Sequence, residues 1–280
     1  MAKINPKDFK LVLDDTLALN KIKKVDDAYI IKAVDSLLIK NQREVLNLKL
    51  ELKDFLFLAL DSNDGPVYVS IKAEVKTPTK IIILITGNNE VIIKNNFNVL
   101  NNLEVIVFGF TEDYFKLDSV YAHKVINANT KIYISSINSK GKIHLYNTKM
   151  IHEVKHTESE INAFGIVKHK SESVFINEGK IEENAVKTII NQNTKGLILD
   201  EGSTIEAKPV LYIDENDVIA NHGAAVGAID ERLIYYLTSR GIKDHEARKM
   251  IIFSYIDMVL DLIESEKIKN LITKNLEKII

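Results

Sequence analysis

The sequence predicts a mainly β protein with a helical segment at its C-terminal end. Short β-branched runs such as KIIILI and LEVIVFGF dominate residues 66–221, as expected of strands. Asparagine, glycine, aspartate and lysine separate these runs, and asparagines cluster between residues 88 and 102. Because asparagine tolerates left-handed backbone, these clusters indicate tight corners. After residue 230 the apolar residues recur at helical spacing instead.

The first 60 residues predict a mixed segment. Apolar residues at helical spacing predict a helix over about 25–40; they are Ala28, Ile31, Val34, Leu37 and Leu38. Leucines then alternate with polar residues over 46–52, as expected of a strand with one buried face. We therefore expect a helical or mixed segment at 1–60, a β core at 61–226 and a helical subdomain at 227–280.

Three helices are predicted in the C-terminal subdomain. In the first, Leu233, Tyr236 and Leu237 share a face, and Gly241 follows its last turn as a stop. Asp244 is expected to N-cap a second helix. A third apolar stripe lies at Ile268, Leu271, Ile272 and Leu276.

Composition excludes several classes of function. The 280 residues carry a net charge of −2, so we expect neither a nucleic-acid nor a membrane partner. The longest apolar run, residues 55–60, is too short to cross a bilayer, and the N-terminus lacks the apolar core of a signal peptide, so a cytoplasmic protein is expected. The absence of cysteine excludes disulfides and thiolate ligands from this chain.

The segment HEVKH matches the zinc-binding pattern HExxH. On a helix, His152 and His156 would share a face and bind zinc, with Glu153 as general base. Strand-like runs flank the segment, which favours polar residues on a strand or turn. Phosphate-binding loops and a GxSxG nucleophile elbow are absent from the sequence.

His222 lies between Asn221 and Gly223, where the strand pattern gives way to helix. The small residues that follow it allow another backbone to approach closely. The imidazole ring of histidine is a common metal ligand. The alternative is a tight connection between two parts of the fold, with a histidine that is only hydrogen-bonded.

Pattern alone leaves two architectures open. Short strands with tight corners are typical of a solenoid and also of a β-sandwich. No clean repeat appears in the sequence that would distinguish them.

The C-terminal half of the chain resembles the SufB/SufD family of iron–sulfur cluster assembly scaffolds. The resemblance lies in AKPVLYIDENDVIANHG followed by AAVGAIDERLIYYLTSRGI, and upstream in FGIVKHKSESVFINEGKIEENAVKTIINQNTKGLILDEGSTIEAKP. It covers roughly residues 150–265. It implies a right-handed parallel β-helix core, with an N-terminal helical part and a C-terminal helical domain.

The resemblance also implies partners. Family members work with SufC, an ABC-type ATPase that docks on the C-terminal helices; here Tyr235, Tyr236, Arg240 and Gly241 would lie on or beside that surface. SufB and SufD pair through their β-helices, and a nascent cluster forms near the interface. His222 occupies the place of the SufD histidine there, as a ligand or an orienting group.

The absence of cysteine favours a SufD-like role beside a Cys-bearing SufB-like chain, or a homodimer when that chain is missing. Some members carry a cysteine two residues before the histidine, where this chain has Ala220.

We expect a scaffold without turnover of its own, which meets the iron–sulfur cluster only transiently and binds none alone. The alternatives are a scaffold without cluster chemistry and an unrelated β-solenoid transferase; a zinc hydrolase is the least favoured.

Overall fold

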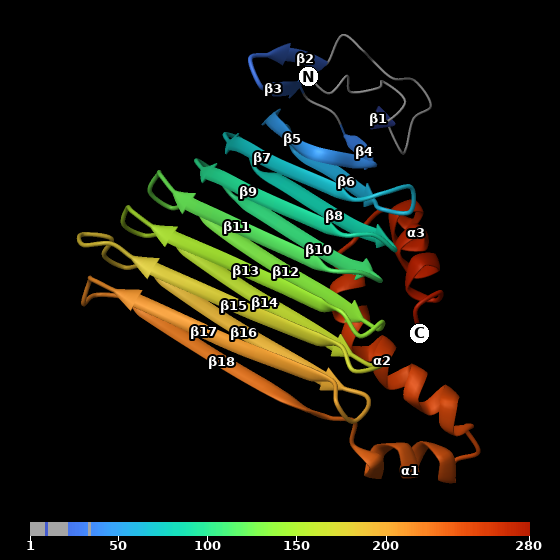
Figure 1. Ribbon diagram of the computed structural model, residues 1–280. Helices are drawn as coiled ribbons and strands as arrows, with labels where there is room; N and C mark the ends of the chain where they lie inside the picture. Colours follow the sequence, from blue (N-terminus) through green and yellow to red (C-terminus); the bar gives the residue numbers. More distant parts are fainter. Residues whose placement is uncertain (1–8, 11–21, 33–34) are drawn as a thin grey trace.

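The computed structural model describes residues 9–10, 22–32 and 35–280, and these form two facing β-sheets with three helices along one of them (Figure 1). From β3 onward the chain alternates between the two sheets, so each coil contributes one strand to each. We name them the covered sheet and the uncovered sheet, because the helices pack on the outer face of the first only.

The covered sheet contains, in spatial order, β1 (Phe9–Lys10), β4 (Ser36–Lys40), β6 (Phe55–Asp61), β8 (Thr79–Gly87), β10 (Leu103–Thr111), β12 (Asn129–Asn138), β14 (Glu158–Val167), β16 (Ile189–Ile198) and β18 (Ile219–Ala228). The uncovered sheet contains β2 (Ile22–Val25), β3 (Ala28–Lys32), β5 (Gln42–Glu51), β7 (Val67–Val75), β9 (Val91–Val99), β11 (Phe115–His123), β13 (Ile143–His152), β15 (Glu172–Ile181) and β17 (Thr204–Ile213).

Neighbouring strands from β3 to β18 all pair in parallel, whereas β1 with β4 and β2 with β3 pair antiparallel. Parallel neighbours need a crossover connection, and here the facing sheet provides it. The architecture is therefore a parallel β-helix, as expected from the resemblance, and the sandwich alternative is wrong.

The coils differ in length, which hides the repeat in the sequence. Val67 pairs with Val91, and Val91 pairs with Phe115, each an offset of 24 residues. Later coils are longer, and Glu172 pairs with Thr204 at an offset of 32. Longer turns absorb the extra residues, so the strands stay in register while the sequence loses its period.

Burial on one or both faces explains two kinds of strand pattern. β7 alternates buried and partly exposed residues, because only its inner face meets the core between the sheets. β6, β8 and β10 read as continuous apolar runs because their outer faces also pack, against the C-terminal helices.

Three helices follow the β-helix, as predicted: α1 (Glu231–Ser239), α2 (Asp244–Leu260) and α3 (Glu266–Leu276). Asp230 caps α1 by accepting a hydrogen bond from the Arg232 amide, and Gly241 follows the helix at φ +89°. Asp244 is the first residue of α2, not its N-cap, and accepts a hydrogen bond from Arg248 Nε. None of the three is long and apolar enough to cross a membrane.

The predicted helix over 25–40 is wrong: β3 and β4 occupy this segment, and Val34 lies outside the described residues. Ile31 pairs with Leu50 and Leu37 with Leu58, which extends both sheets. Leu37 is buried in the core between the sheets, and Leu38 packs toward the helices. Adjacent leucines are therefore both in apolar surroundings, one on each face of the same strand. The apolar residues do not alternate with polar ones, so their spacing in the sequence resembles that of a helix.

Candidate functional site

The last coil leaves the end of the β-helix open. β17 and β18 are the terminal strands of their sheets within the described ranges, and each is ten residues long. β18 is exposed almost throughout. The backbone groups on the outer edges of both strands have no strand partner, so they are available to pair with another chain.

Small residues dominate the inner row of this last coil. Ala220, Ala224 and Val226 continue the inward-facing columns of β16, and Ala207 continues that of β15. On the opposite, outer face of the same strand, a side chain added at Gly227 would also meet no atom within 4 Å. The side chains at the open end are therefore short and mostly apolar, so the backbone of a second chain can approach it closely.

His222 is the polar residue of that inner row in β18. It pairs in register with Gln192 of β16, and its side chain is exposed. It makes no hydrogen bond or ion pair to any residue that the structure describes. The imidazole is thus free to meet a group brought by a partner, and the interpretation as a hydrogen-bonded connector is wrong for the chain on its own.

The column of side chains beneath His222 changes character just before the open end. The register places five aliphatic residues one above another from β6 to β14: Leu56, Ile81, Val105, Ile132 and Ile161. Gln192 comes next and His222 ends the column. Gln192 is 3% exposed, its Nε2 donates to the Val210 carbonyl at 3.4 Å, and its Oε1 has no partner among the described atoms. Sequence reasoning missed Gln192, because only the strand register places it beside His222.

The zinc interpretation of HEVKH is wrong. His152 ends β13 with a buried side chain bonded to the Ser159 hydroxyl at 2.8 Å, whereas His156 lies in a turn at φ +59° with its side chain exposed. Glu153 forms an ion pair with Lys124. The three residues therefore do not converge on a metal position.

Three histidines are buried inside the β-helix. His123 and His152 face each other with their Nδ1 atoms 3.2 Å apart, and His144 Nε2 lies 3.1 Å from the Asp113 carbonyl oxygen. Burial lowers the pKa of His123 and of His144 to about 4, and burial together with the neighbouring His123 lowers that of His152 further. All three are neutral at pH 7 and contribute to the packing and hydrogen bonding of the interior.

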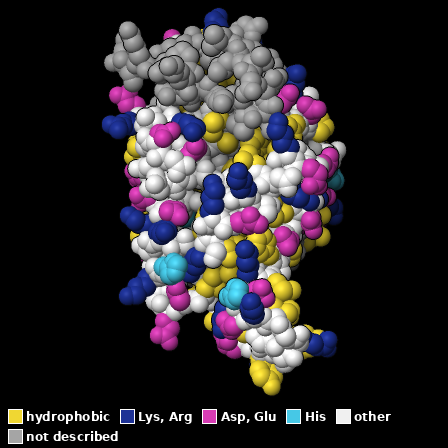
Figure 2. All heavy atoms as spheres, turned by 90° about the vertical axis from the view of Figure 1, so that its right-hand side faces the viewer, with side chains coloured by type: hydrophobic (Ala, Val, Ile, Leu, Met, Phe, Trp, Pro, Cys, Tyr) yellow, Lys and Arg dark blue, Asp and Glu magenta, His cyan; other side chains and the backbone are white. Residues whose placement is uncertain are grey.

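The four residues predicted for ATPase docking lie on and directly after α1. Tyr235 is 76% exposed and Tyr236 is 52% exposed, and the guanidinium of Arg240 lies 5.1 Å from the centre of the Tyr236 ring. Ile234 is the only buried residue of α1, so Tyr236, predicted to share an apolar face with Leu233 and Leu237, is exposed and does not pack in the core. Figure 2 shows the helix-bearing side of the molecule, where charges of both signs alternate with apolar side chains.

An ion-pair cluster holds α1 against α2. Arg248 of α2 donates to both carboxylate oxygens of Glu231 at 3.0 and 3.1 Å and to Asp244 at 2.9 Å. A bidentate pair of this kind fixes orientation as well as distance. The exposed tyrosines therefore lie on a helix whose orientation is fixed by ion pairs to α2. No hydrogen bond or ring contact between described residues joins them to His222.

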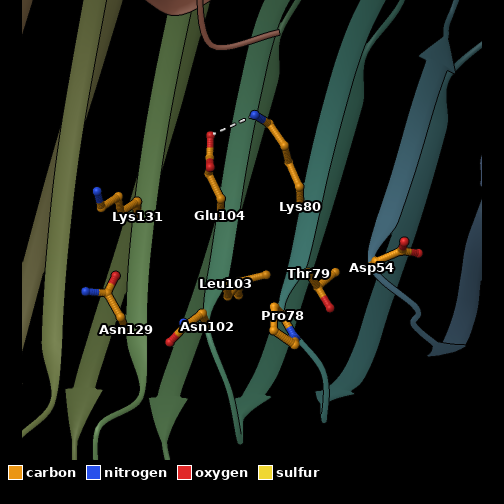
Figure 3. A pocket seen from close by; sticks show the side chains of 9 residues that line it. All are labelled: Asp54, Pro78, Thr79, Lys80, Asn102, Leu103, Glu104, Asn129 and Lys131. Atoms are coloured by element: carbon orange, nitrogen blue, oxygen red, sulfur yellow. Dashed lines mark ion pairs between the residues drawn. The ribbon is translucent and has the colours of Figure 1, made fainter. Parts of the chain in front are cut away.

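A groove of about 530 Å³ lies over the starts of β8, β10 and β12 (Figure 3). Lys80 and Glu104 point toward each other across it at 3.2 Å, with Lys131 on the next strand. Lys80 also donates to the Leu262 carbonyl at 2.6 Å. Its charge therefore joins the sheet to the α2–α3 connection, which is a structural role.

Side chains able to bind metal are sparse. Within the described residues no group of three or more His, Asp or Glu side chains is arranged to hold an ion, and the sequence has no cysteine. His222 offers one imidazole nitrogen, and the chain offers no thiolate.

The fold and this site define a parallel β-helix protein whose open end presents one histidine and whose helical tail presents aromatic residues. Residues 101–255, more than half of the chain, match the family model described as SUF system FeS cluster assembly, SufBD core domain. The chain therefore belongs to the SufBD family.

Several relatives bear the name iron-sulfur cluster assembly protein SufD. The Bacillus subtilis protein is 36% identical over 133 residues, covering 48% of this chain and 30% of the relative. The Escherichia coli protein is 34% identical over 104 residues, covering 37% and 25%. The Plasmodium falciparum protein is 32% identical over 140 residues, covering 49% and 9%. The matched segment thus spans less than a third of each of these relatives.

Proposed function

We propose that this chain is a SufD-like scaffold of iron–sulfur cluster assembly, without turnover of its own. It pairs through the open end of its β-helix with a Cys-bearing SufB-like chain and presents His222 to the cluster formed between them. The observation that carries the proposal is the exposed, unbonded imidazole of His222 on a terminal strand whose outer edge is unpaired.

The open end supports a protein partner. Long exposed edge strands normally carry devices that prevent pairing, such as charged side chains or proline. β18 carries neither over its ten residues, whereas β17 carries Pro209 and the charged pair Glu206 and Lys208, so β18 is the better candidate for pairing. Chemistry favours a thiolate-bearing partner, since iron–sulfur clusters take cysteine ligands and this chain has none. A second copy of this chain could cover the same edge but would add no thiolate.

The exposed residues of α1, which ion pairs hold against α2, support the proposal of a second protein partner. Two tyrosines and an arginine together are the residue types that dominate binding energy at protein interfaces. We propose that a SufC-type ATPase docks on α1 through Tyr235, Tyr236 and Arg240, with Gly241 ending the helix at that surface. The C-terminal subdomain at 227–280 would then transmit nucleotide-driven movement to the last coil.

Replacing His222 by alanine is expected to leave the complex intact and to lower its cluster yield by about tenfold or more. Side-chain loss at an exposed position costs little stability, whereas a lost ligand cannot be replaced locally. The measurement is co-purification with the Cys-bearing chain and the ATPase, followed by anaerobic reconstitution and absorbance. His245→Ala is the matched control, because His245 is exposed on α2 and lies in no predicted site.

Equal cluster yields in the two variants, with the complex present, would favour a scaffold without cluster chemistry. Failure to form any complex would bring the solenoid-transferase alternative forward.

Replacing Tyr235 by serine is expected to weaken capture of the ATPase by at least about tenfold, since a tyrosine anchor contributes about 2 kcal/mol at an interface centre. The measurement is the dissociation constant for the ATPase alone. Ile126→Ser is the control, because Ile126 is 50% exposed on the turn after β11. Similar affinities for both variants would move the docking surface away from α1.

A further inference from the structure

We propose that Gln192 is a positioning residue for His222: its Oε1 accepts the N–H of one imidazole nitrogen and so directs the other nitrogen, unprotonated, out of the open end. This inference rests on the proposed role of His222. It concerns which of the two ring nitrogens is available as a ligand.

The first argument is that the buried side-chain amide of Gln192 destabilises the folded chain at this position of the column. The same column is aliphatic in every coil from Leu56 to Ile161. An isoleucine at 192 would continue that core, whereas a buried acceptor without a partner lowers the stability of the folded chain. The glutamine Oε1 bears this cost in the chain alone. A polar residue that does not serve the core therefore needs another explanation.

The second argument is the geometry of the amide. Its Nε2 is directed to the Val210 carbonyl of β17. With the donor end held in this way, the Oε1 end remains as an acceptor only. Gln192 needs one N–H donor from above to complete its hydrogen bonds.

The third argument is proximity. In-register neighbours on parallel strands lie about 4.8 Å apart and project to the same side of the sheet. His222 is that neighbour, and its ring has no competing partner among the described residues. A rotation of the exposed side chain is enough to bring an N–H to Gln192, and a partner that covers the open end would hold the ring in that position.

A hydrogen bond of this kind fixes the tautomer of a ligating histidine. Metal-bound histidines donate their second ring N–H to a carbonyl, carboxylate or water, and loss of that acceptor typically weakens binding 10- to 100-fold. Gln192 supplies such an acceptor from inside the β-helix, out of reach of solvent.

The test is the tautomer of His222 in the complex with the Cys-bearing chain, read from imidazole ¹⁵N shifts after histidine labelling, with His222→Ala to assign the signals. We expect one tautomer in the parent chain and a mixture in Gln192→Leu. The leucine matches the aliphatic column, so thermal stability should stay equal or rise. Asn191→Leu is the control, because Asn191 lies next in β16 and bonds Asn221 on the outer face.

An unchanged tautomer in Gln192→Leu overturns the positioning role. Cluster retention separates the two proposals. If His222→Ala lowers retention and Gln192→Leu lowers it by about tenfold, both stand. If the tautomer shifts in Gln192→Leu while His222→Ala leaves retention unchanged, the positioning role stands and the cluster role of His222 fails.

Discussion

Replacing Gly165 by valine is expected to lower the free energy of unfolding by about 3 kcal/mol. A Cβ at this position of β14 would lie 2.6 Å from Phe175 Cε2 and 2.8 Å from its Cζ. The Phe175 ring cannot move aside, since it is fully buried and stacks on Tyr146 with ring centres 4.8 Å apart. The covered sheet thus needs glycine where the uncovered sheet places an aromatic ring.

Urea unfolding measures this effect, with Gly227→Val as the matched control. Gly227 lies in an equivalent strand at the open end, and its added side chain would meet nothing within 4 Å. The control should stay within about 0.5 kcal/mol of the parent chain. Gly165→Val combined with Phe175→Leu should lose less than the sum of the two single changes, because the smaller side chain makes room. Additive losses would contradict the proposed clash.

Acidification from pH 7 to pH 5 is expected to destabilise the β-helix steeply. His123 and His144 have pKa values of about 4 when folded and ordinary values near 6.5 when unfolded, and that of His152 is also depressed. Between these values the unfolded chain binds protons that the folded chain does not. The stabilisation is therefore complete above about pH 6.5 and is lost as the pH falls.

Each histidine contributes up to about 1.4 kcal/mol per pH unit below pH 6, so the three together contribute about 4 kcal/mol per unit. The measurement is the free energy of unfolding in urea at pH 7, 6 and 5. His144→Phe keeps an aromatic ring beside Phe115 and Tyr146 and should reduce the slope by about a third. His245→Gln, an exposed change, should leave it unaltered. A free energy that is constant from pH 7 to pH 5 would refute the prediction.

Histidine shows how far site prediction from sequence reached. His222 stood out because small residues surround it where strand gives way to helix, and the structure places it on an exposed strand. His152 stood out equally through HEVKH, yet its ring is buried. Both side chains point to the inside of their coils; the next coil stacks over His152, whereas His222 lies in the last coil, which nothing covers in the described structure.

By itself, the sequence determined the β-rich body, the three C-terminal helices and the absence of thiol ligands, because local patterns and residue chemistry suffice for each. The residue pattern left a solenoid and a sandwich open, and the family resemblance implied the parallel stacking. Tertiary structure alone decided that helices cover one sheet and that Gln192 lies under His222. These features depend on contacts between residues about 24 to 32 positions apart, and the coils vary in length. The offset that brings two side chains together is set by how each turn packs, so no local pattern in the sequence contains it.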